Sequence, residues 1–240
     1  MAGPLTILHL YPEQMNLYGD RGNVLALVQR ARWRGISAEV ISAGVGDVIP
    51  WDQVNLVFMG GGEDTHQAQI ADDFLRLADP LIDRLNQGVP MLAICGAYQL
   101  MGKRYVTADG RQLPGIGYFD VWTEPGTTRA IGDVVVETEL PIVPVTLVGF
   151  ENHGGRTHLG PSAQPLARVK LGQGNNGQDG TEGTIRGHAI GTYLHGSLLP
   201  KNPHLTDLLL SWALNTDLSP LDSETEWEAH RMIVARAQNH

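Results

Sequence analysis

The sequence predicts an α/β fold with a mostly parallel central sheet, flanked by helices and extended by additional antiparallel strands. Two observations in the first hundred residues favour this fold. Short apolar runs alternate with helical segments, and glycines or small residues directly follow two of those runs. After residue 105 the pattern changes to β-branched runs separated by glycine and proline. A length of 240 residues with 42% hydrophobic residues fits one domain over residues 1–240.

The N-terminal half has a β-α-β rhythm. Its predicted strands are residues 5–10, 38–42, 56–59 and 91–94. Between the first two, residues 24–34 carry apolar side chains at helical spacing. Asp64 or Thr65 is expected to cap a further helical region that extends to about residue 86 and is interrupted at Pro80. Parallel strands joined in this way place their carboxyl ends at one edge of the sheet, where α/β proteins bind ligands.

The C-terminal half mixes short strands and helices. Residues 131–136 and 143–148 are predicted to be antiparallel or mixed strands in hairpins. A segment from Asn202 or Pro203 to residue 215 and residues 224–238 have helical patterns and are expected to cover the sheet. The glycine-rich residues 172–180 are either a mobile surface hairpin or a lid or partner-docking loop.

The chain has one cysteine, Cys95, where an apolar strand gives way to a helical segment. At such an elbow the sulfur lies at the positive end of a helix, which favours the thiolate. The small neighbours Ala93, Gly96 and Ala97 permit a tight turn whose backbone N–H groups face a substrate. A buried structural cysteine is the alternative, but it would not need these neighbours.

A base and an oxyanion site follow two other predicted strands. Among nine histidines, His195 comes directly after the strand-like residues 188–194, so its imidazole can meet the sulfur at the sheet edge. Taken alone, a histidine in a surface loop is the alternative. Residues 60–62 are three glycines after another strand. They form a plain turn or, beside a nucleophile, donate N–H groups to an oxyanion together with Gly96.

This combination resembles the class I glutamine amidotransferases, most closely their cobyric acid synthase-like branch. The resemblance rests on residues 94–102 around Cys95, the glycine run at 60–62, the Gly-Phe-Glu-Asn-His sequence at 149–153, and His195. Residues 11–23, 149–157 and 172–180 are further similar to glutaminase subunits that work with MurT, a Mur-ligase-like protein. The likeness covers nearly the whole chain.

The resemblance implies a class I glutamine amidotransferase-like fold and a glutaminase that forms a thioester. Cys95 attacks the side-chain amide of L-glutamine, His195 moves the proton, and water clears the thioester. The implied oxyanion donors are Gly61, Gly62 and Gly96, and the implied substrate-binding residues are Arg129 and Gln99. A solvated loop arginine is the alternative for Arg129.

One departure from the family leaves the third catalytic residue open. Many class I enzymes carry a glutamate two residues after the catalytic histidine, and this chain has Ser197 there. Either Asp20 or Glu151 orients the imidazole instead, or Cys95 and His195 act as a dyad. Ala97 also replaces a glycine that is usual at the elbow.

Ammonia becomes an amide nitrogen only when a carboxylate has been activated, and this chain has no phosphate-binding Gly-x-x-x-x-Gly-Lys-Ser/Thr motif. The resemblance therefore implies a heterodimer with a MurT-like Mur ligase subunit that carries ATP and Mg²⁺. The implied acceptor is the D-glutamate of lipid II, which places the chain in peptidoglycan synthesis. We expect no cofactor in this chain and no metal site, since His153 and His158 lack further ligands at suitable spacing.

Composition and charge argue against several other classes of protein. A formal net charge of -9 disfavours a nucleic-acid surface. No apolar stretch approaches about 18 residues, so we expect no integral membrane protein. One cysteine and no visible secretory signal favour a cytoplasmic location. The open alternatives are a glutaminase serving another carboxylate of the cobyrinic acid type, a Cys-His γ-glutamyl hydrolase, and a non-catalytic binding module.

Overall fold

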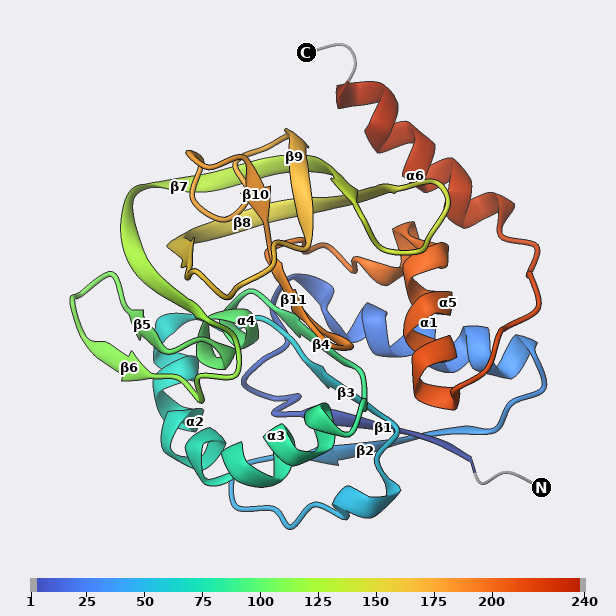
Figure 1. Ribbon diagram of the computed structural model, residues 1–240, viewed down its shortest axis with the longest axis horizontal. Helices are drawn as coiled ribbons and strands as arrows, with labels where there is room; N and C mark the ends of the chain where they lie inside the picture. Colours follow the sequence, from blue (N-terminus) through green and yellow to red (C-terminus); the bar gives the residue numbers. More distant parts are fainter. Residues whose placement is uncertain (1–3, 238–240) are drawn as a thin grey trace.

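The computed structural model describes residues 4–237, and its centre is a six-stranded sheet ordered β11-β12-β4-β3-β1-β2 (Figure 1). Within it, neighbouring strands pair in parallel except at the β11–β12 edge. The strands are Leu5–Leu10 (β1), Ala38–Ala43 (β2), Leu56–Met59 (β3), Met91–Ile94 (β4), Thr184–Arg186 (β11) and Ala189–Thr192 (β12). All residues of β1, β3, β4 and β12 are buried, which explains why these strands lack polar alternation.

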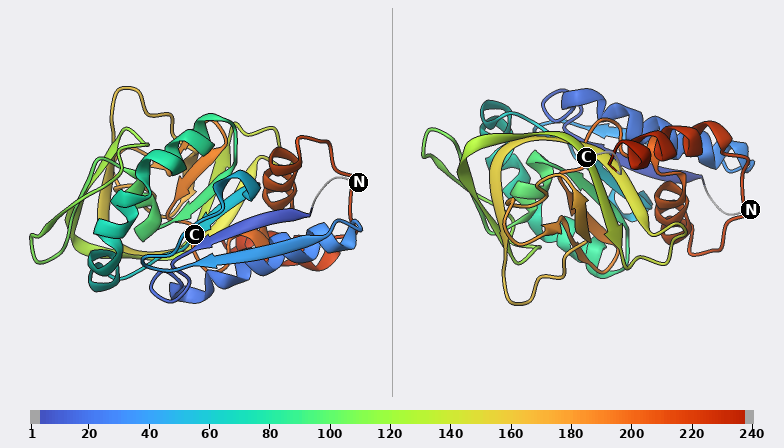
Figure 2. Two further views of the ribbon diagram at one scale, coloured as in Figure 1. Left: turned by 90° about the horizontal axis from the view of Figure 1, so that it is seen from below. Right: turned by 90° about the horizontal axis from the view of Figure 1, so that it is seen from above.

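Helices cover both faces of this sheet. Around the central strands, α1 packs against α5, and α2 packs against α3 and α4 (Figure 2). Their bounds are Arg21–Trp33 (α1), Asp64–Arg76 (α2), Ala78–Asn86 (α3), Gly96–Met101 (α4) and Pro203–Leu214 (α5). Short 3₁₀ turns are Leu17–Gly19 (η1), Trp51–Gln53 (η2) and Leu199–Lys201 (η3). The predicted α/β architecture and its four N-terminal strands are confirmed, with small shifts at their ends.

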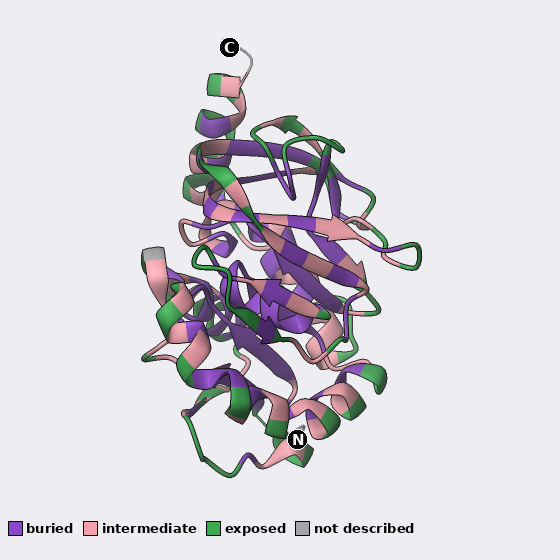
Figure 3. Cartoon of the chain, turned by 90° about the vertical axis from the view of Figure 1, so that its left-hand side faces the viewer, coloured by how far each residue is buried: buried purple, intermediate pink, exposed green. Residues whose placement is uncertain are grey.

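A second sheet, ordered β10-β9-β7-β5-β6 with β8 paired to β7, packs against the first and carries one wall of the site. Its strands are Arg104–Val106 (β5), Gln112–Pro114 (β6), Val121–Thr138 (β7), Thr146–Leu159 (β8), Ala167–Leu171 (β9) and Thr181–Glu182 (β10). One continuous hydrophobic cluster contains residues of both sheets. In Figure 3 buried residues gather in the interior strands, and exposed residues lie on helix surfaces, loops and parts of the outer strands.

The predicted short strands at 131–136 and 143–148 were wrong in length, because β7 and β8 are long and bent. The register of this antiparallel pair shifts between Pro125 and Ala130, where β7 curves (Figure 1). Proline and glycine therefore bend the strand without ending it. The C-terminal helix α6 (Glu224–Ala237) packs on β7 and β8 rather than on the central sheet, through Ile233 against Val135 and Val148.

The predicted helix break at Pro80 is also wrong. The chain turns at Leu77, and Pro80 is the third residue of α3. In the first turn a proline costs little, because N–H groups there have no partner within the helix. Glu63, rather than Asp64 or Thr65, precedes α2. Asp64 instead accepts hydrogen bonds from the Tyr105 hydroxyl and the Ala108 N–H.

Residues 172–180 do not form the free-standing hairpin that their composition suggests. Asn175 and Asn176 are buried, and Asn176 donates to the Thr157 carbonyl at 3.1 Å. The backbone N–H groups of Gln173 and Gly174 donate to the carboxylate of Glu151. The glycine-rich segment is therefore fixed to β8 at several points.

Candidate active site

Cys95 forms the elbow between β4 and α4. Its backbone has φ 51° and ψ -102°, a conformation that costs a non-glycine residue about 1–3 kcal/mol. Its N–H donates to the Thr192 carbonyl at the end of β12, at 2.8 Å. The side chain lines a cavity of about 410 Å³. The chain thus holds a strained cysteine at the carboxyl edge of the central sheet, facing an open cavity.

His195 meets Cys95 at this edge. It follows β12, and its backbone pairs with Phe150 of β8 through bonds of 2.8 and 3.2 Å. Gly61 shows how closely the groups converge. A methyl group built on Gly61 would lie 2.8 Å from His195 Cε1 and 3.4 Å from Cys95 Cβ. A side chain at this position would push against the imidazole, so glycine allows the ring to lie where it does.

Asp20 is the acid beside His195. Its Oδ1 lies 3.6 Å from His195 Nδ1, and both side chains are fully buried. Ser197, which stands where many relatives have glutamate, donates from Oγ to the Gly19 carbonyl at 2.7 Å. The serine therefore binds the segment that delivers Asp20.

Electrostatics favours a charged imidazole. Burial alone would lower the pKa of His195. Interactions with Cys95 and with the Asp20 carboxylate raise it by more than burial lowers it. The pKa of His195 is therefore raised above its ordinary value. The arrangement therefore favours an imidazolium beside Cys95.

The glycine run supplies fewer oxyanion donors than expected. Gly61 does not fit this role, because its N–H already donates to Asp20 Oδ2 at 2.6 Å. Its carbonyl accepts the Leu17 N–H at 3.1 Å, which fixes the peptide that carries the Gly62 N–H. A methyl group on Gly96 would lie 2.9 Å from the Gly62 nitrogen. The Gly62 nitrogen therefore lies close to Gly96, the residue that follows Cys95, and the oxyanion roles of Gly62 and Gly96 stay predictions.

Of the polar residues that form the floor of the cavity, the sequence pointed to Gln99 only. Gln99 lines the cavity, but its amide oxygen accepts from Gln67 at 3.0 Å and its amide nitrogen donates to the Tyr193 hydroxyl at 3.0 Å. Gln67 also donates to the Gly62 carbonyl at 3.1 Å. Gln99 thus shapes the floor, and its direct contact with substrate stays a prediction. Nothing in the sequence marked Gln67 or Tyr193, which lie in ordinary helix and strand patterns.

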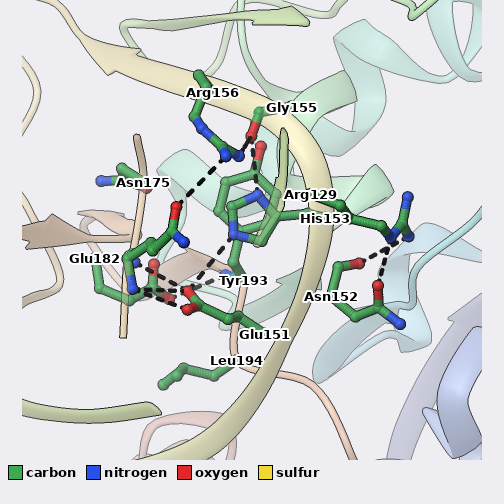
Figure 4. Close-up of polar contacts among 12 residues, drawn as sticks. Arg129, Glu151, Asn152, His153, Gly155, Arg156, Asn175, Glu182, Tyr193 and Leu194 are labelled. Atoms are coloured by element: carbon green, nitrogen blue, oxygen red, sulfur yellow. Dashed lines mark hydrogen bonds and ion pairs between the residues drawn. The ribbon is translucent and has the colours of Figure 1, made fainter. Parts of the chain in front are cut away.

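Arg129 lies on the wall of the cavity, as a substrate-binding residue would. It is exposed, and its guanidinium donates to the side chain and to the carbonyl of Asn152, the latter at 3.1 Å. Figure 4 shows Arg129 and Asn152 on one side of β8, and Glu151 and His153 on the other. The same cavity is lined by Glu63 and Asp64. Its lining therefore includes both a guanidinium and carboxylates.

Glu151 is not the acid that orients His195. Its carboxylate accepts the N–H groups of Gln173 and Gly174 at 2.8 to 3.1 Å and lies 3.8 Å from His153 Nε2. His153 itself hydrogen-bonds the Gly155 carbonyl through Nδ1 and stacks on Tyr193, with ring centroids 3.7 Å apart. These two residues hold the glycine-rich segment and the site wall in place.

Within residues 4–237, no cluster of three or more His, Cys, Asp and Glu side chains is placed to hold a metal ion. His158 stacks on Trp122, away from His153. Across the same residues, none of the helices has both the length and the apolar character needed to cross a membrane.

Comparison with known proteins agrees with this geometry. Residues 6–203 match the CobB/CobQ-like glutamine amidotransferase domain. The chain is 41% identical to the Staphylococcus aureus lipid II isoglutaminyl synthase (glutamine-hydrolyzing) subunit GatD, over 97% of this chain and 96% of that protein. It is 37% identical to the Streptococcus pneumoniae GatD subunit, over 88% and 80% of the two chains. A probable cobyric acid synthase of Methanosphaera stadtmanae is 31% identical, but the match covers 48% of this chain and 25% of that protein.

Two solved structures share the fold. One is described as a glutamine amidotransferase, with a TM-score of 0.59 and 18% identity over 86% of this chain and 98% of that one. The other is the glutaminase domain of Trypanosoma brucei CTPS with bound acivicin, with a TM-score of 0.55 and 11% identity over 90% and 96%. Through the domain match and its full-length similarity to the GatD subunits, the chain belongs to the CobB/CobQ-like glutamine amidotransferase family.

Proposed function

We propose that this protein is the glutaminase subunit of a lipid II isoglutaminyl synthase. It hydrolyses L-glutamine through a Cys95 thioester and delivers the ammonia to a MurT-like ligase in the cytoplasm. The observation that carries the chemistry is the meeting of Cys95, His195 and Asp20 around Gly61, at a cavity that also reaches Arg129. The choice of partner and acceptor is supported by the full-length similarity to the two GatD subunits.

The reaction begins with the thiolate–imidazolium pair. The Cys95 thiolate attacks the side-chain carbonyl carbon of glutamine, and the carbonyl oxygen becomes an oxyanion bound by the Gly62 and Gly96 N–H groups. The imidazolium of His195 gives its proton to the amide nitrogen, so that ammonia leaves and a thioester remains. His195 then takes a proton from water, the hydroxide attacks the thioester, and glutamate leaves as the thiolate re-forms.

Two residues support these steps without taking part in bond making. Asp20 stabilises the imidazolium and keeps its ring in orientation, since its carboxylate faces Nδ1. Arg129 binds the α-carboxylate of glutamine on the cavity wall, because a guanidinium pairs with a carboxylate in bidentate geometry.

The ammonia acceptor is activated on the partner. ATP and Mg²⁺ belong to the MurT-like subunit, which phosphorylates the D-glutamate carboxyl of lipid II, and ammonia displaces the phosphate. The phosphate-binding motif missing from this chain is consistent with that division of labour.

The test is a glutamate-release assay on this chain together with the ligase subunit that co-purifies with it. We expect glutamine-dependent glutamate release that Cys95→Ala abolishes, and conversion of the lipid II carboxyl to an amide when ATP is added. Amidation of a cobyrinic acid-type carboxylate in place of lipid II would reject the proposed acceptor. Preference for γ-glutamyl peptides over glutamine would favour the Cys-His hydrolase, and no turnover with any substrate would favour a binding module.

A further inference from the structure

A buried carboxylate outside the catalytic group holds the backbone between β12 and His195. Glu182 of β10 is fully buried and reaches the end of β12 from the second sheet. One of its oxygens accepts the Tyr193 N–H at 2.9 Å and also the hydroxyl proton of Thr192. The chain leaves the regular ladder here, so each buried N–H group needs an acceptor of another kind.

Thr192 connects Glu182 to both catalytic residues. Its carbonyl accepts the Cys95 N–H at 2.8 Å, and its hydroxyl accepts the Leu194 N–H at 3.0 Å. The next N–H, that of His195, donates to the carbonyl of Phe150. Hydrogen bonds therefore fix the chain from Thr192 to His195, and Glu182 accepts two of them, from the Thr192 hydroxyl and the Tyr193 N–H.

Asn175 of the glycine-rich segment holds Glu182 in place. Its side chain accepts the Gly183 N–H and donates to the Gly183 carbonyl, both at 3.0 Å. The same oxygen accepts the hydroxyl proton of Tyr98 in α4, the helix that follows Cys95. Gly183 has φ +60°, and a methyl group there would lie 2.4 Å from the Gly191 carbonyl, so a glycine is required. The segment thus connects Gly183, the residue after Glu182, with the nucleophile helix.

A carboxyl group at the position of Glu182 lowers the stability of the fold. Burial raises its pKa, the nearby Glu151 adds to the effect, and hydrogen bonds from Thr192 and Tyr193 oppose it, so that the pKa rises to about 7. Its second oxygen has no hydrogen-bond partner among residues 4–237. A buried carboxyl with an unpaired oxygen destabilises a fold relative to an apolar side chain. Packing alone therefore does not explain a glutamate here.

We propose that Glu182, held by Asn175, is a positioning residue for Cys95 and His195. Its carboxylate fixes Thr192 and Tyr193 and thereby sets how the nucleophile and the base meet. The inference rests on the proposed glutaminase chemistry, yet neither Glu182 nor Asn175 is among the residues that line the Cys95 cavity. Loss of Glu182 should accordingly slow the chemical step and leave glutamine binding almost unchanged.

The test compares Glu182→Gln and Glu182→Ala with wild type in the complex with the ligase subunit. Glutamine retains an oxygen that can accept both hydrogen bonds, so we expect kcat for glutamate release within about threefold of wild type. Alanine leaves the Tyr193 N–H without an acceptor, so we expect kcat to fall about 10- to 100-fold and KM to stay within about twofold. The rate of Cys95 alkylation by iodoacetamide should fall in parallel with kcat.

Thr192→Val provides a second variant if Glu182→Ala does not fold. It removes the hydroxyl and keeps the side-chain shape, so it should lower kcat without raising KM. Where Glu182→Ala does fold, the effect of Thr192→Val should not add to that of Glu182→Ala. Asp179→Asn is the matched control. Asp179 accepts bonds from Thr181 and Asn176 in the same segment, and we expect its variant to stay within threefold of wild type.

A raised KM with unchanged kcat in the alanine or valine variant would overturn the positioning role, as would additive effects in the double variant. Equal losses in Asp179→Asn would overturn it too, because they would point to general loosening of the segment. Failure of the glutaminase proposal looks different. Wild type would then release no glutamate, while the alkylation rates would still separate Glu182→Ala from wild type.

Discussion

Replacing Asp20 by asparagine removes one negative charge beside His195 and little else. The asparagine oxygen can still accept the Gly61 N–H, so the glycine run at 60–62 keeps its position. The charge that is lost lies 3.6 Å from His195 Nδ1. At that separation Coulomb's law with an effective dielectric of about 20 gives roughly 4–5 kcal/mol of gross attraction.

The net loss should be smaller than the gross attraction, since the amide dipole remains beside the ring. We expect about half of it, roughly 2–3 kcal/mol, which corresponds to a loss of about 30- to 150-fold in kcat/KM for glutamate release. The pKa of His195 should also fall. His195 must carry its proton to release ammonia, so the decline of kcat at high pH should begin at lower pH in the variant.

The assay is glutamate release by the complex, followed against pH, with Glu151→Gln as the matched control. Glu151 binds backbone N–H groups of the glycine-rich segment, so its variant should leave the position of the alkaline decline unchanged whatever it does to the rate. An Asp20→Asn enzyme within threefold of wild type, with the decline at its original pH, would refute the role of Asp20. A shift in the Glu151 variant alone would assign that role to Glu151.

Three other substitutions test separate parts of the site. Gly61→Ala should lower kcat about 100-fold with little change in melting temperature, because its methyl group would lie 2.8 Å from His195 Cε1, and full activity would contradict the close approach. Arg129→Ala should raise KM for glutamine about tenfold or more with a smaller change in kcat, and an unchanged KM would reject its contact with the carboxylate. Gln67→Leu should lower kcat about tenfold, because Gln67 hydrogen-bonds both the Gly62 carbonyl and Gln99. An unaffected kcat would show that the glycine run at 60–62 does not need these hydrogen bonds.

The sequence indicated the sheet edge and its pair of catalytic candidates because both depend on local patterns. A short apolar strand followed by small residues at Cys95, and another strand ending at His195, are visible without knowledge of the tertiary fold. In a parallel sheet those strand ends must meet at one edge. The convergence around Gly61 follows from that topology.

The third residue could not be chosen from the sequence, because its position depends on an irregular path. Residues 11–20 pass over the glycine run at 60–62. Tyr11 has a positive φ, and the Leu17 N–H donates a hydrogen bond to the Gly61 carbonyl. No periodic pattern encodes that path, so Asp20 and Glu151 were equal candidates. Burial explains why the sequence did not mark Glu182 as a candidate. Glu182 stands in a polar, glycine-rich sequence, and only the tertiary structure encloses its carboxylate.

Residues 172–180 illustrate how composition can mislead. Glycine and asparagine usually mark mobile loops, but here glycines at positive φ let the chain fold around Asn175. The side chain of Asn175 then binds Gly183 and Tyr98. The same residue types therefore produced a fixed support, because their hydrogen bonds are directed inward.

The most direct measurement of the central claim is covalent labelling with a glutamine analogue that carries an electrophilic diazoketone in place of the amide. We predict that peptide mass spectrometry finds the adduct on Cys95, with a labelling rate that His195→Ala lowers about 10²- to 10⁴-fold. An adduct on another residue, or a His195→Ala protein labelled as fast as wild type, would contradict catalysis by this pair.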